Sequence, residues 1–244
     1  MPAAAAVPSL CHPDAEPVEA AAGVESKGRR ESFELLKARL AAKPVTLPVE
    51  AVVPTAVPEL DALLGGGLPV GTISTLEGET GCWSLAAGLV ATITRRSLVA
   101  ILDDGSLYPP ALAETGISLE RVLVVPARRA LAMARAADIL LRSRICRLVL
   151  MPAVALRDAV WERLAKLAHR SGVLLIVVAA RAAAALSAVA AVRLHCALIR
   201  VIVHGRRGLW GTLAGFELGI NVRKHKHMMA GGSVRVRVAH VALR

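Results

Sequence analysis

Residues 78–85, GETGCWSL, have the spacing of a phosphate-binding loop but lack its reactive side chains. In the pattern G-x-x-x-x-G-K-[ST], backbone N–H groups and a lysine hold the phosphates, while a hydroxyl group holds Mg²⁺. Counting from Gly78 places Trp83 at the second glycine, Ser84 at the lysine and Leu85 at the hydroxyl position. These residue types predict a loop that no longer does phosphate chemistry.

The two glycines of this segment keep a structural use. Gly78 and Gly81 stand where a strand-like run turns into an alanine-rich helix, and glycine tolerates the backbone angles of tight turns. Together with Ser84 they mark a vestigial phosphate loop. Free N–H groups at the start of a helix attract anions weakly, but we expect no bound cofactor and no catalytic residue.

The elements that position this loop alternate between strand-like and helical segments from residue 50 onward. Continuous apolar runs predict buried strands at residues 72–78, 98–104, 121–125, 147–151 and 173–178. Helical patterns lie between them, near residues 84–96, 109–116, 128–143 and 155–170. Such alternation predicts an α/β fold with a parallel sheet covered by helices on both faces.

The two ends of the chain have a different character. After residue 196, alternating apolar and polar residues with glycine breaks predict an antiparallel C-terminal extension. The composition of residues 1–30 predicts a disordered tail. We expect a short helix (31–42) with a linker over residues 31–49. The core with its basic C-terminal strands is expected over residues 50–244. The short helix needs a surface to cover its apolar face, either on its own core or on a partner. The candidate partner-binding residues are Phe33, Leu36 and Leu40.

Charge and composition narrow the classes of function. The net charge is +11, and residues 190–244 hold ten Lys and Arg against the single acid Glu217. Such a region favours polyanions, although a basic solvated surface is the alternative. The four cysteines lack metal-site or redox spacing and come without a secretory signal, so we expect a reduced, cytoplasmic protein. Residues 172–192 are apolar but read as a strand followed by an alanine-rich helix, not as a membrane span.

The order of segments resembles the RecA-like recombinase core over roughly residues 50–226. Two quoted stretches carry the resemblance, PTAVPELDALLGGGLPVGTISTLEG (54–78) and VAILDDGSLYPPALAETGISLERVLVVPARRALAMARAADILLRSRICRLVLMPAVAL (99–156). Within that superfamily the chain looks most like the ImuA group of SOS mutagenesis accessory proteins, which combine an N-terminal helix, a compact core and a basic C-terminal strand region. The resemblance implies a RecA-like sheet with an antiparallel extension.

In register with this family, two further catalytic positions lack their usual residues. The acidic residue that orients the attacking water falls at Gly105, beside Asp103 and Asp104, and the strand-end aspartate that holds Mg²⁺ falls at Met151. With Ser84 in place of lysine, little remains to stabilise phosphoryl transfer. We therefore expect a protein that is not an enzyme.

The family's DNA-binding loops also look deleted, because helical segments follow Met151 and Val178 closely. The basic C-terminal region remains as a candidate contact for DNA phosphates or for an acidic protein surface. His225 and His227 make a weak metal signal without a nearby Cys or carboxylate, so we expect no metal. The candidate DNA-binding residues are Arg223, Lys224, Lys226, Arg235 and Arg237.

The resemblance implies a non-catalytic adaptor in DNA-damage-induced translesion synthesis. Its implied partners are an ImuB-like Y-family polymerase homologue and an error-prone C-family polymerase, with weak nonspecific DNA binding and no membrane. Two alternatives stay open at this point: a DNA-dependent ATPase or recombinase paralogue, and an SOS-induced inhibitor that binds a cell-division protein.

Overall fold

The computed structural model describes residues 52–204, 211–228 and 230–239. The predicted tail, the helix over residues 31–42 and its apolar residues Phe33, Leu36 and Leu40 lie outside the described residues. A two-stranded sheet of β1 (Val52–Val53) and β2 (Leu68–Pro69) flanks α2 (Pro58–Leu63) at the entrance to the core.

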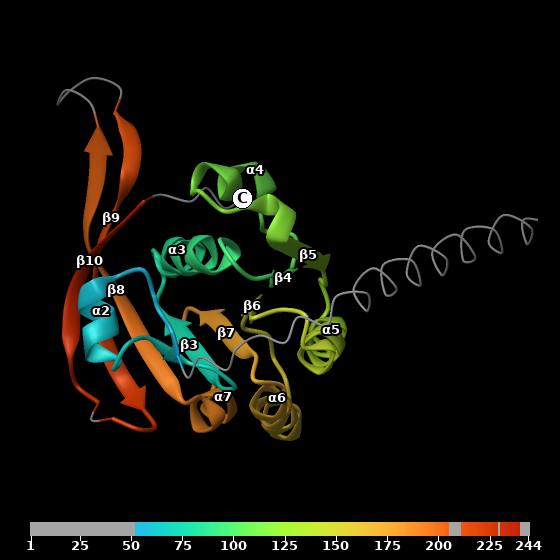
Figure 1. The fold of residues 1–244 in the computed structure, drawn as a ribbon. Helices are drawn as coiled ribbons and strands as arrows, with labels where there is room; N and C mark the ends of the chain where they lie inside the picture. Colours follow the sequence, from blue (N-terminus) through green and yellow to red (C-terminus); the bar gives the residue numbers. More distant parts are fainter. Residues whose placement is uncertain (1–51, 205–210, 229, 240–244) are drawn as a thin grey trace, which may run out of the picture. The chain divides into compact units, whose positions relative to one another are not determined.

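An eight-stranded sheet forms the centre of the described chain, in the order β10-β9-β8-β3-β7-β6-β4-β5 (Figure 1). The strands from β8 to β5 are parallel where they pair, and β9 and β10 are antiparallel. All five predicted core strands are confirmed to within two residues. The bounds are β3 (Ile73–Glu77), β4 (Val99–Asp103), β5 (Val122–Pro126), β6 (Leu148–Pro152), β7 (Leu174–Ala179), β8 (Val192–His204), β9 (Thr212–His225) and β10 (Ser233–Ala239).

Helices cover both faces of the parallel strands. Side chains alternate along each strand, so Leu148 and Leu150 join one apolar cluster while Val149 and Met151 join the other. Figure 1 shows one face under α3 (Cys82–Thr94) and α4 (Pro109–Glu114), and the other under α5 (Ala130–Ser143), α6 (Asp158–Ser171) and α7 (Ala184–Val189). The short 3₁₀ helix Leu119–Arg121 leads into β5. The predicted α/β architecture is confirmed.

The segment after β7 departs from its prediction. The alanine-rich helix expected over residues 181–192 is confined to α7, and β8 already begins at Val192 and pairs in parallel with β3. Val192 and Leu194 are buried whereas Arg193 and His195 are partly exposed. This period of two suits a strand, and burial against the sheet outweighs the helix preference of the alanines.

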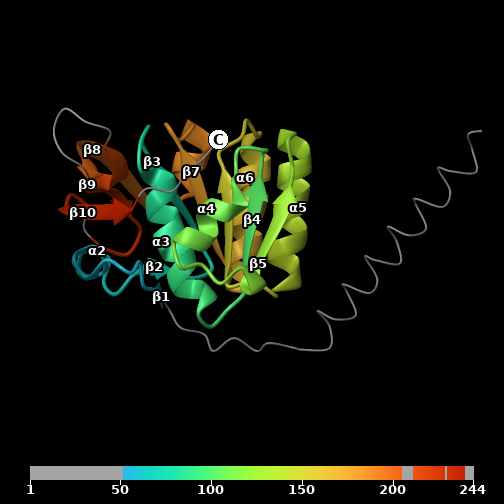
Figure 2. The same cartoon turned by 90° about the horizontal axis from the view of Figure 1, so that it is seen from above.

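The C-terminal strands form one side of the sheet. Figure 2 shows β8, β9 and β10 on one side of the parallel strands and α5 on the other. Leu218, Ile220 and Val236 face inward and join the apolar cluster that contains α3. Among the described residues, no helix combines the length and hydropathy needed to cross a bilayer.

Candidate functional site

The vestigial phosphate loop keeps the geometry of a strand-to-helix turn. β3 ends at Glu77, Gly78 has a φ of 148°, Gly81 has a φ of 81°, and α3 begins at Cys82. The loop opens on a hollow of about 420 Å³. Its lining comprises the loop residues Gly78, Glu79, Thr80, Gly81, Cys82, Trp83 and Ser84, together with Val178, Ala179, Ala180 and Phe216.

Both glycines are needed for packing against the C-terminal strands. A Cβ atom at Gly78 would lie 2.2 Å from the carbonyl oxygen of Cys196 on β8. A Cβ atom at Gly81 would lie 2.6 Å from the side chain of Leu218 on β9. The loop therefore holds glycine where its own backbone meets the extension, and this need is independent of any phosphate.

Ser84, Leu85 and Met151, which the sequence register aligns with catalytic positions of the family, carry neutral, buried side chains. Leu85 is 2% exposed and packs in the apolar cluster beside α3, while Met151 is fully buried on the opposite face of the sheet. Ser84 is also buried beside the hollow. None of the described residues that line the hollow is a lysine or an arginine.

The turn after β4 explains the acidic residues beside Gly105. The Asp103 carboxylate accepts the backbone N–H groups of Gly105 at 2.9 Å and Leu107 at 3.0 Å. Asp104 likewise accepts the N–H group of Ser106 at 3.1 Å. These carboxylates hold their own turn in place, which is a structural task.

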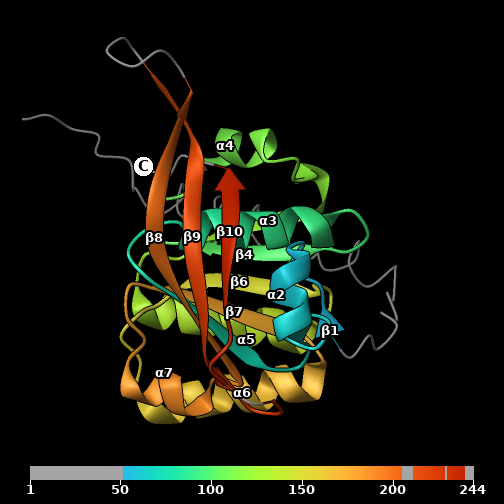
Figure 3. The ribbon, with the colours of Figure 1, turned by 90° about the vertical axis from the view of Figure 1, so that its left-hand side faces the viewer.

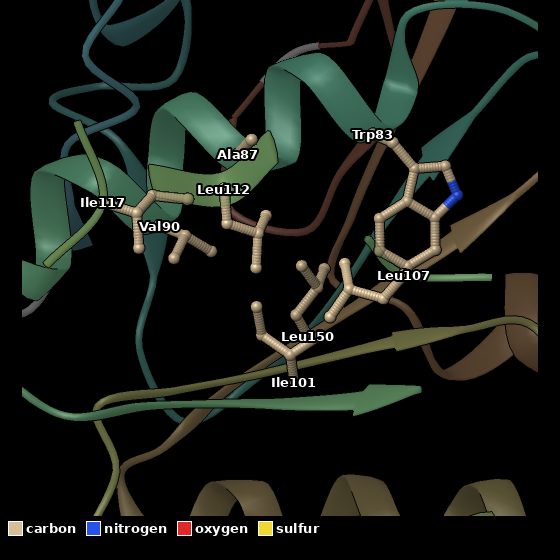
Figure 4. Close-up of a pocket in the computed structure, with 8 residues that line it drawn as sticks. All are labelled: Trp83, Ala87, Val90, Ile101, Leu107, Leu112, Ile117 and Leu150. Atoms are coloured by element: carbon tan, nitrogen blue, oxygen red, sulfur yellow. The ribbon is translucent and has the colours of Figure 1, made fainter. Parts of the chain in front are cut away.

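Trp83 occupies the position of the second glycine in the phosphate-loop pattern. Figure 4 shows its indole beside Leu107, at one end of a gap between α3, α4 and the sheet. The gap measures about 10 Å³, about the space that one water molecule needs. Its lining is apolar, so it reads as a packing defect and not as a ligand site.

A partly buried ion pair beside the loop was not predicted from the sequence. Arg193 on β8 donates from Nε to Oε1 of Glu77 at 2.7 Å and from a terminal nitrogen to Oε2 at 2.9 Å. The Thr75 hydroxyl donates to the same Oε1 at 2.8 Å. The sequence did contain a signal for this pair: Glu77 and Arg193 each stand within an otherwise apolar run. Since buried charges require partners, such residues can be expected to pair.

This ion pair sets the protonation of Glu77. Burial by itself raises the pKa of Glu77, but the hydrogen bonds from Arg193 and Thr75 and the charge of Arg193 outweigh burial and lower it. The side chain of Glu77 is 7% exposed and that of Arg193 27%. The carboxylate therefore stays charged and ties the last residue of β3 to the C-terminal extension.

Two cysteine thiols complete the contact between loop and extension. The Cys82 thiol lies 3.6 Å from the carbonyl oxygen of Gly78, and its pKa is lowered by the neighbouring Cys196 thiol. The hydrogen bond to Cys82, together with burial, raises the pKa of Cys196. Polar contacts thus fill the space between the loop and β8.

The connections after β6 and β7 are short, as predicted. Residues 153–157 join β6 to α6, and residues 180–183 join β7 to α7. The N–H group of Ala153 donates to the carbonyl oxygen of Val178, so the β6–α6 connection begins hydrogen-bonded to the neighbouring strand β7. Neither segment has the length of a loop that could surround a nucleic-acid strand.

The candidate DNA-binding residues separate into two groups. Arg235 and Arg237 are exposed and alternate on β10 with inward-facing valines, and Arg223 and Lys226 are exposed on or near β9. Lys224 instead donates to the carbonyl oxygens of Ser187 at 3.0 Å and Ala188 at 2.9 Å, at the end of α7. Burial, with the charges of Arg193 and Lys226, lowers its pKa. Lys224 therefore caps a helix.

The histidine that ends β9 and the one that follows it by two residues contact each other. The rings of His225 and His227 lie 6.5 Å apart, edge to face, and the His227 N–H group donates to Nδ1 of His225. Burial, with the charge of His227, lowers the pKa of His225. In the part of the chain that the structure describes, no group of three or more His, Cys, Asp or Glu side chains could hold a metal.

Comparison with known proteins supports the architecture. The family model of the MT3502 N-terminal domain matches residues 61–185. No curated protein matches the chain. The crystal structure of the RadB recombinase superposes with a TM-score of 0.60 at 19% identity, covering 76% of this chain and 96% of that one. The predicted RecA-like fold is confirmed, and at this identity the likeness concerns the fold alone.

Proposed function

The chain belongs to the MT3502 N-terminal domain family and has a RecA-like fold, and from this premise we propose that it is a non-catalytic adaptor in DNA-damage-induced translesion synthesis. In this role the RecA-like core is a scaffold for protein contacts and does not hydrolyse ATP. The partners proposed are an ImuB-like Y-family polymerase homologue and an error-prone C-family polymerase, by resemblance to the ImuA group.

One observation supports the proposal: the loop forms a strand-to-helix turn, and in the register assigned from the sequence the positions of the charged groups hold Ser84, Gly105 and Met151. Leu85 and Met151 are buried in different apolar clusters, and neither side chain carries an oxygen that could bind Mg²⁺. Ser84 offers a neutral hydroxyl where a cation would be required. Gly78 and Gly81 are needed for the close contact with β8 and β9.

Weak DNA binding belongs to the proposal as a secondary contact. Arg235 and Arg237 point outward from β10, and Arg223 and Lys226 are exposed nearby. Cations spaced along one region bind phosphates without sequence preference and lose affinity as salt rises. Such binding would hold the adaptor near its substrate while the protein partners supply specificity.

The test is ATP binding and turnover by the purified full chain. We expect no Mg²⁺-dependent hydrolysis above background, and calorimetric binding weaker than about 10 µM, or roughly −7 kcal/mol. An active RecA-like ATPase serves as the positive control in the same assay. Tighter binding or turnover would contradict the non-catalytic function.

The adaptor role has its own test in cells. Capture of the tagged chain from DNA-damaged cells should retain the ImuB-like homologue, and deletion of the gene should lower damage-induced mutation. Retention of a cell-division protein in place of the polymerase homologue would contradict the translesion role.

A further inference from the structure

The outer half of β8 has a free edge. One edge of β8 pairs with β9 from Val192 to His204, whereas the other edge pairs with β3 only as far as His195. Beyond His195, none of the described residues pairs with this second edge. Figures 1 and 3 show the upper parts of β8 and β9 projecting beyond the helices as an arm, with β8 outermost.

The arm exposes large apolar side chains in an unusual concentration. Of nine exposed large apolar side chains in the described residues, four fall within six residues of β8: Leu198 (43%), Ile199 (47%), Val201 (46%) and Val203 (56%). Leu198 lies opposite Leu218, and Val201 lies opposite Phe216. Paired residues share a face of the sheet, so an apolar face continues from the core onto the arm, where no described element covers it.

Other edges of the same sheet are protected and this one is not. On β10, the exposed Arg235 and Arg237 discourage pairing with a further strand, and β5 is short and ends at Pro126. Residues 197–204 contain neither lysine nor proline, and Arg200 is neutralised by Glu217 at 2.6 Å. The β8–β9 ladder has two register shifts within the arm, between Leu198 and Arg200 and between Ile202 and Val203, and neither adds a charge to the outer edge.

The basic charge of residues 190–244 favours an acidic partner segment at the free edge of β8. Residues 190–244 carry ten Lys and Arg and one acid, and that acid, Glu217, already pairs with Arg200. Arg206 and Arg207 follow β8 in the sequence. A second copy of this basic chain would bring like charges together, whereas acidic residues at the ends of an incoming strand would be attracted.

We propose that the free edge of β8 binds an extended apolar segment of a partner protein, flanked by acidic residues, which adds to the sheet as a further strand. Main-chain hydrogen bonds would supply the affinity, and Leu198, Val201 and Val203 the side-chain contacts. The inference deepens the proposed adaptor function and rests on it for the existence of a protein partner. A standard interface buries about 800 Å² on each side, so one strand at this edge binds weakly by itself.

The test uses fluorescein-labelled peptides and the full chain in a fluorescence-anisotropy titration. The first peptide alternates Val and Thr and carries Glu residues at both ends; a second has Lys in place of Glu, and a third has Pro at its centre. We expect the Glu peptide to bind roughly tenfold more tightly than the Lys peptide. The Pro peptide should not bind, because proline removes a ladder hydrogen bond.

Variants locate the binding surface. Val201→Lys should weaken Glu-peptide binding at least about tenfold, because it places a charge at the centre of the new strand contact. Val203→Lys repeats the test at the next side chain on that face, and thermal melting verifies that each variant folds. Leu131→Lys on α5, where the side chain is 61% exposed, is the matched control and should leave binding unchanged.

Several outcomes would overturn the inference. The inference would be wrong if the Glu peptide did not bind saturably, or if the Glu and Lys peptides bound with equal affinity. It would also be wrong if both β8 variants bound the Glu peptide as the wild type does. Dimerisation of the full chain in sedimentation, abolished by Val201→Lys, would assign the edge to a second copy instead. ATP turnover by the full chain would contradict the non-catalytic function and leave the peptide result standing, so the two failures are distinguishable.

Discussion

The phosphate-loop region and the β8–β9 arm differ in how they use their surface. Around Gly78 and Gly81, main-chain and side-chain atoms of β8 and β9 approach so closely that a single added carbon has no room. On the arm, Val201 and Val203 remain about half exposed and one strand edge is unpaired. The region with the binding-site motif is engaged in packing, and the region without a motif has the surface that a partner can use.

The largest effect is expected from Gly78→Ala, which tests whether the loop is held by packing. The new Cβ atom would meet the Cys196 carbonyl at a φ of 148°, so we expect the free energy of unfolding to fall by about 4 kcal/mol. Urea denaturation measures it. Gly88→Ala on α3 is the matched control, since a Cβ atom there meets nothing within 4 Å.

In a helix, Gly to Ala at an open position stabilises by about 1 kcal/mol. The two substitutions should therefore change stability in opposite directions. If Gly78→Ala were as stable as the wild type, the inference that packing against β8 requires glycine at this position would be contradicted.

Glu77→Gln should have the next largest effect, because it breaks the ion pair that joins the loop to the extension. Loss of one partner leaves Arg193 without its counter-charge, and we expect a loss of about 3 kcal/mol at pH 7. Glu162→Gln is the control: its ion pair with Lys166 is exposed, and such pairs contribute less than about 1 kcal/mol.

The same pair predicts a pH dependence. The pKa of Glu77 is lowered below 4.5 in the folded protein, so its stabilising contribution is present above about that pH and is lost as the pH falls through the lowered value. The difference in unfolding free energy between the wild type and Glu77→Gln should therefore shrink below pH 4.5. A difference that stays constant down to pH 3 would show that the Glu77 carboxylate gains nothing from Arg193.

The smallest effect concerns DNA, and it separates exposed from engaged cations. Each phosphate contact contributes about −0.9 to the log–log salt slope for duplex DNA, so Arg235→Ala with Arg237→Ala should flatten the slope by roughly one to two units. Lys224→Ala should leave the slope unchanged and lower stability by about 1 kcal/mol, because its ammonium group bonds to carbonyls of α7. DNA titrations at several salt concentrations measure the slope for each variant, and urea denaturation measures the stability of Lys224→Ala. An unchanged slope in the arginine variant would exclude β10 as the DNA contact.

Local patterns were sufficient to predict most of the elements. Apolar runs such as residues 147–151 and 173–178 have the length and composition of buried parallel strands, and the register from Gly78 identified Ser84 and Leu85. These features depend on neighbours in the chain, and side-chain periodicity reports them directly. The start of β8 was not predicted, because the alanines that precede Val192 favour a helix until a sheet is available to bury them.

Only the tertiary structure decided which residues meet across long separations. Glu77 and Arg193 are 116 positions apart, and no spacing rule predicts that such a pair will close. The engagement of Lys224 with α7 and the free edge of β8 likewise follow from strand order, which depends on the packing of the whole sheet. The sequence determined which elements form and which residue types occupy the loop, since those are local properties of residue type. Packing determined which charges are paired and which edge stays open, since these depend on distances that no local pattern contains.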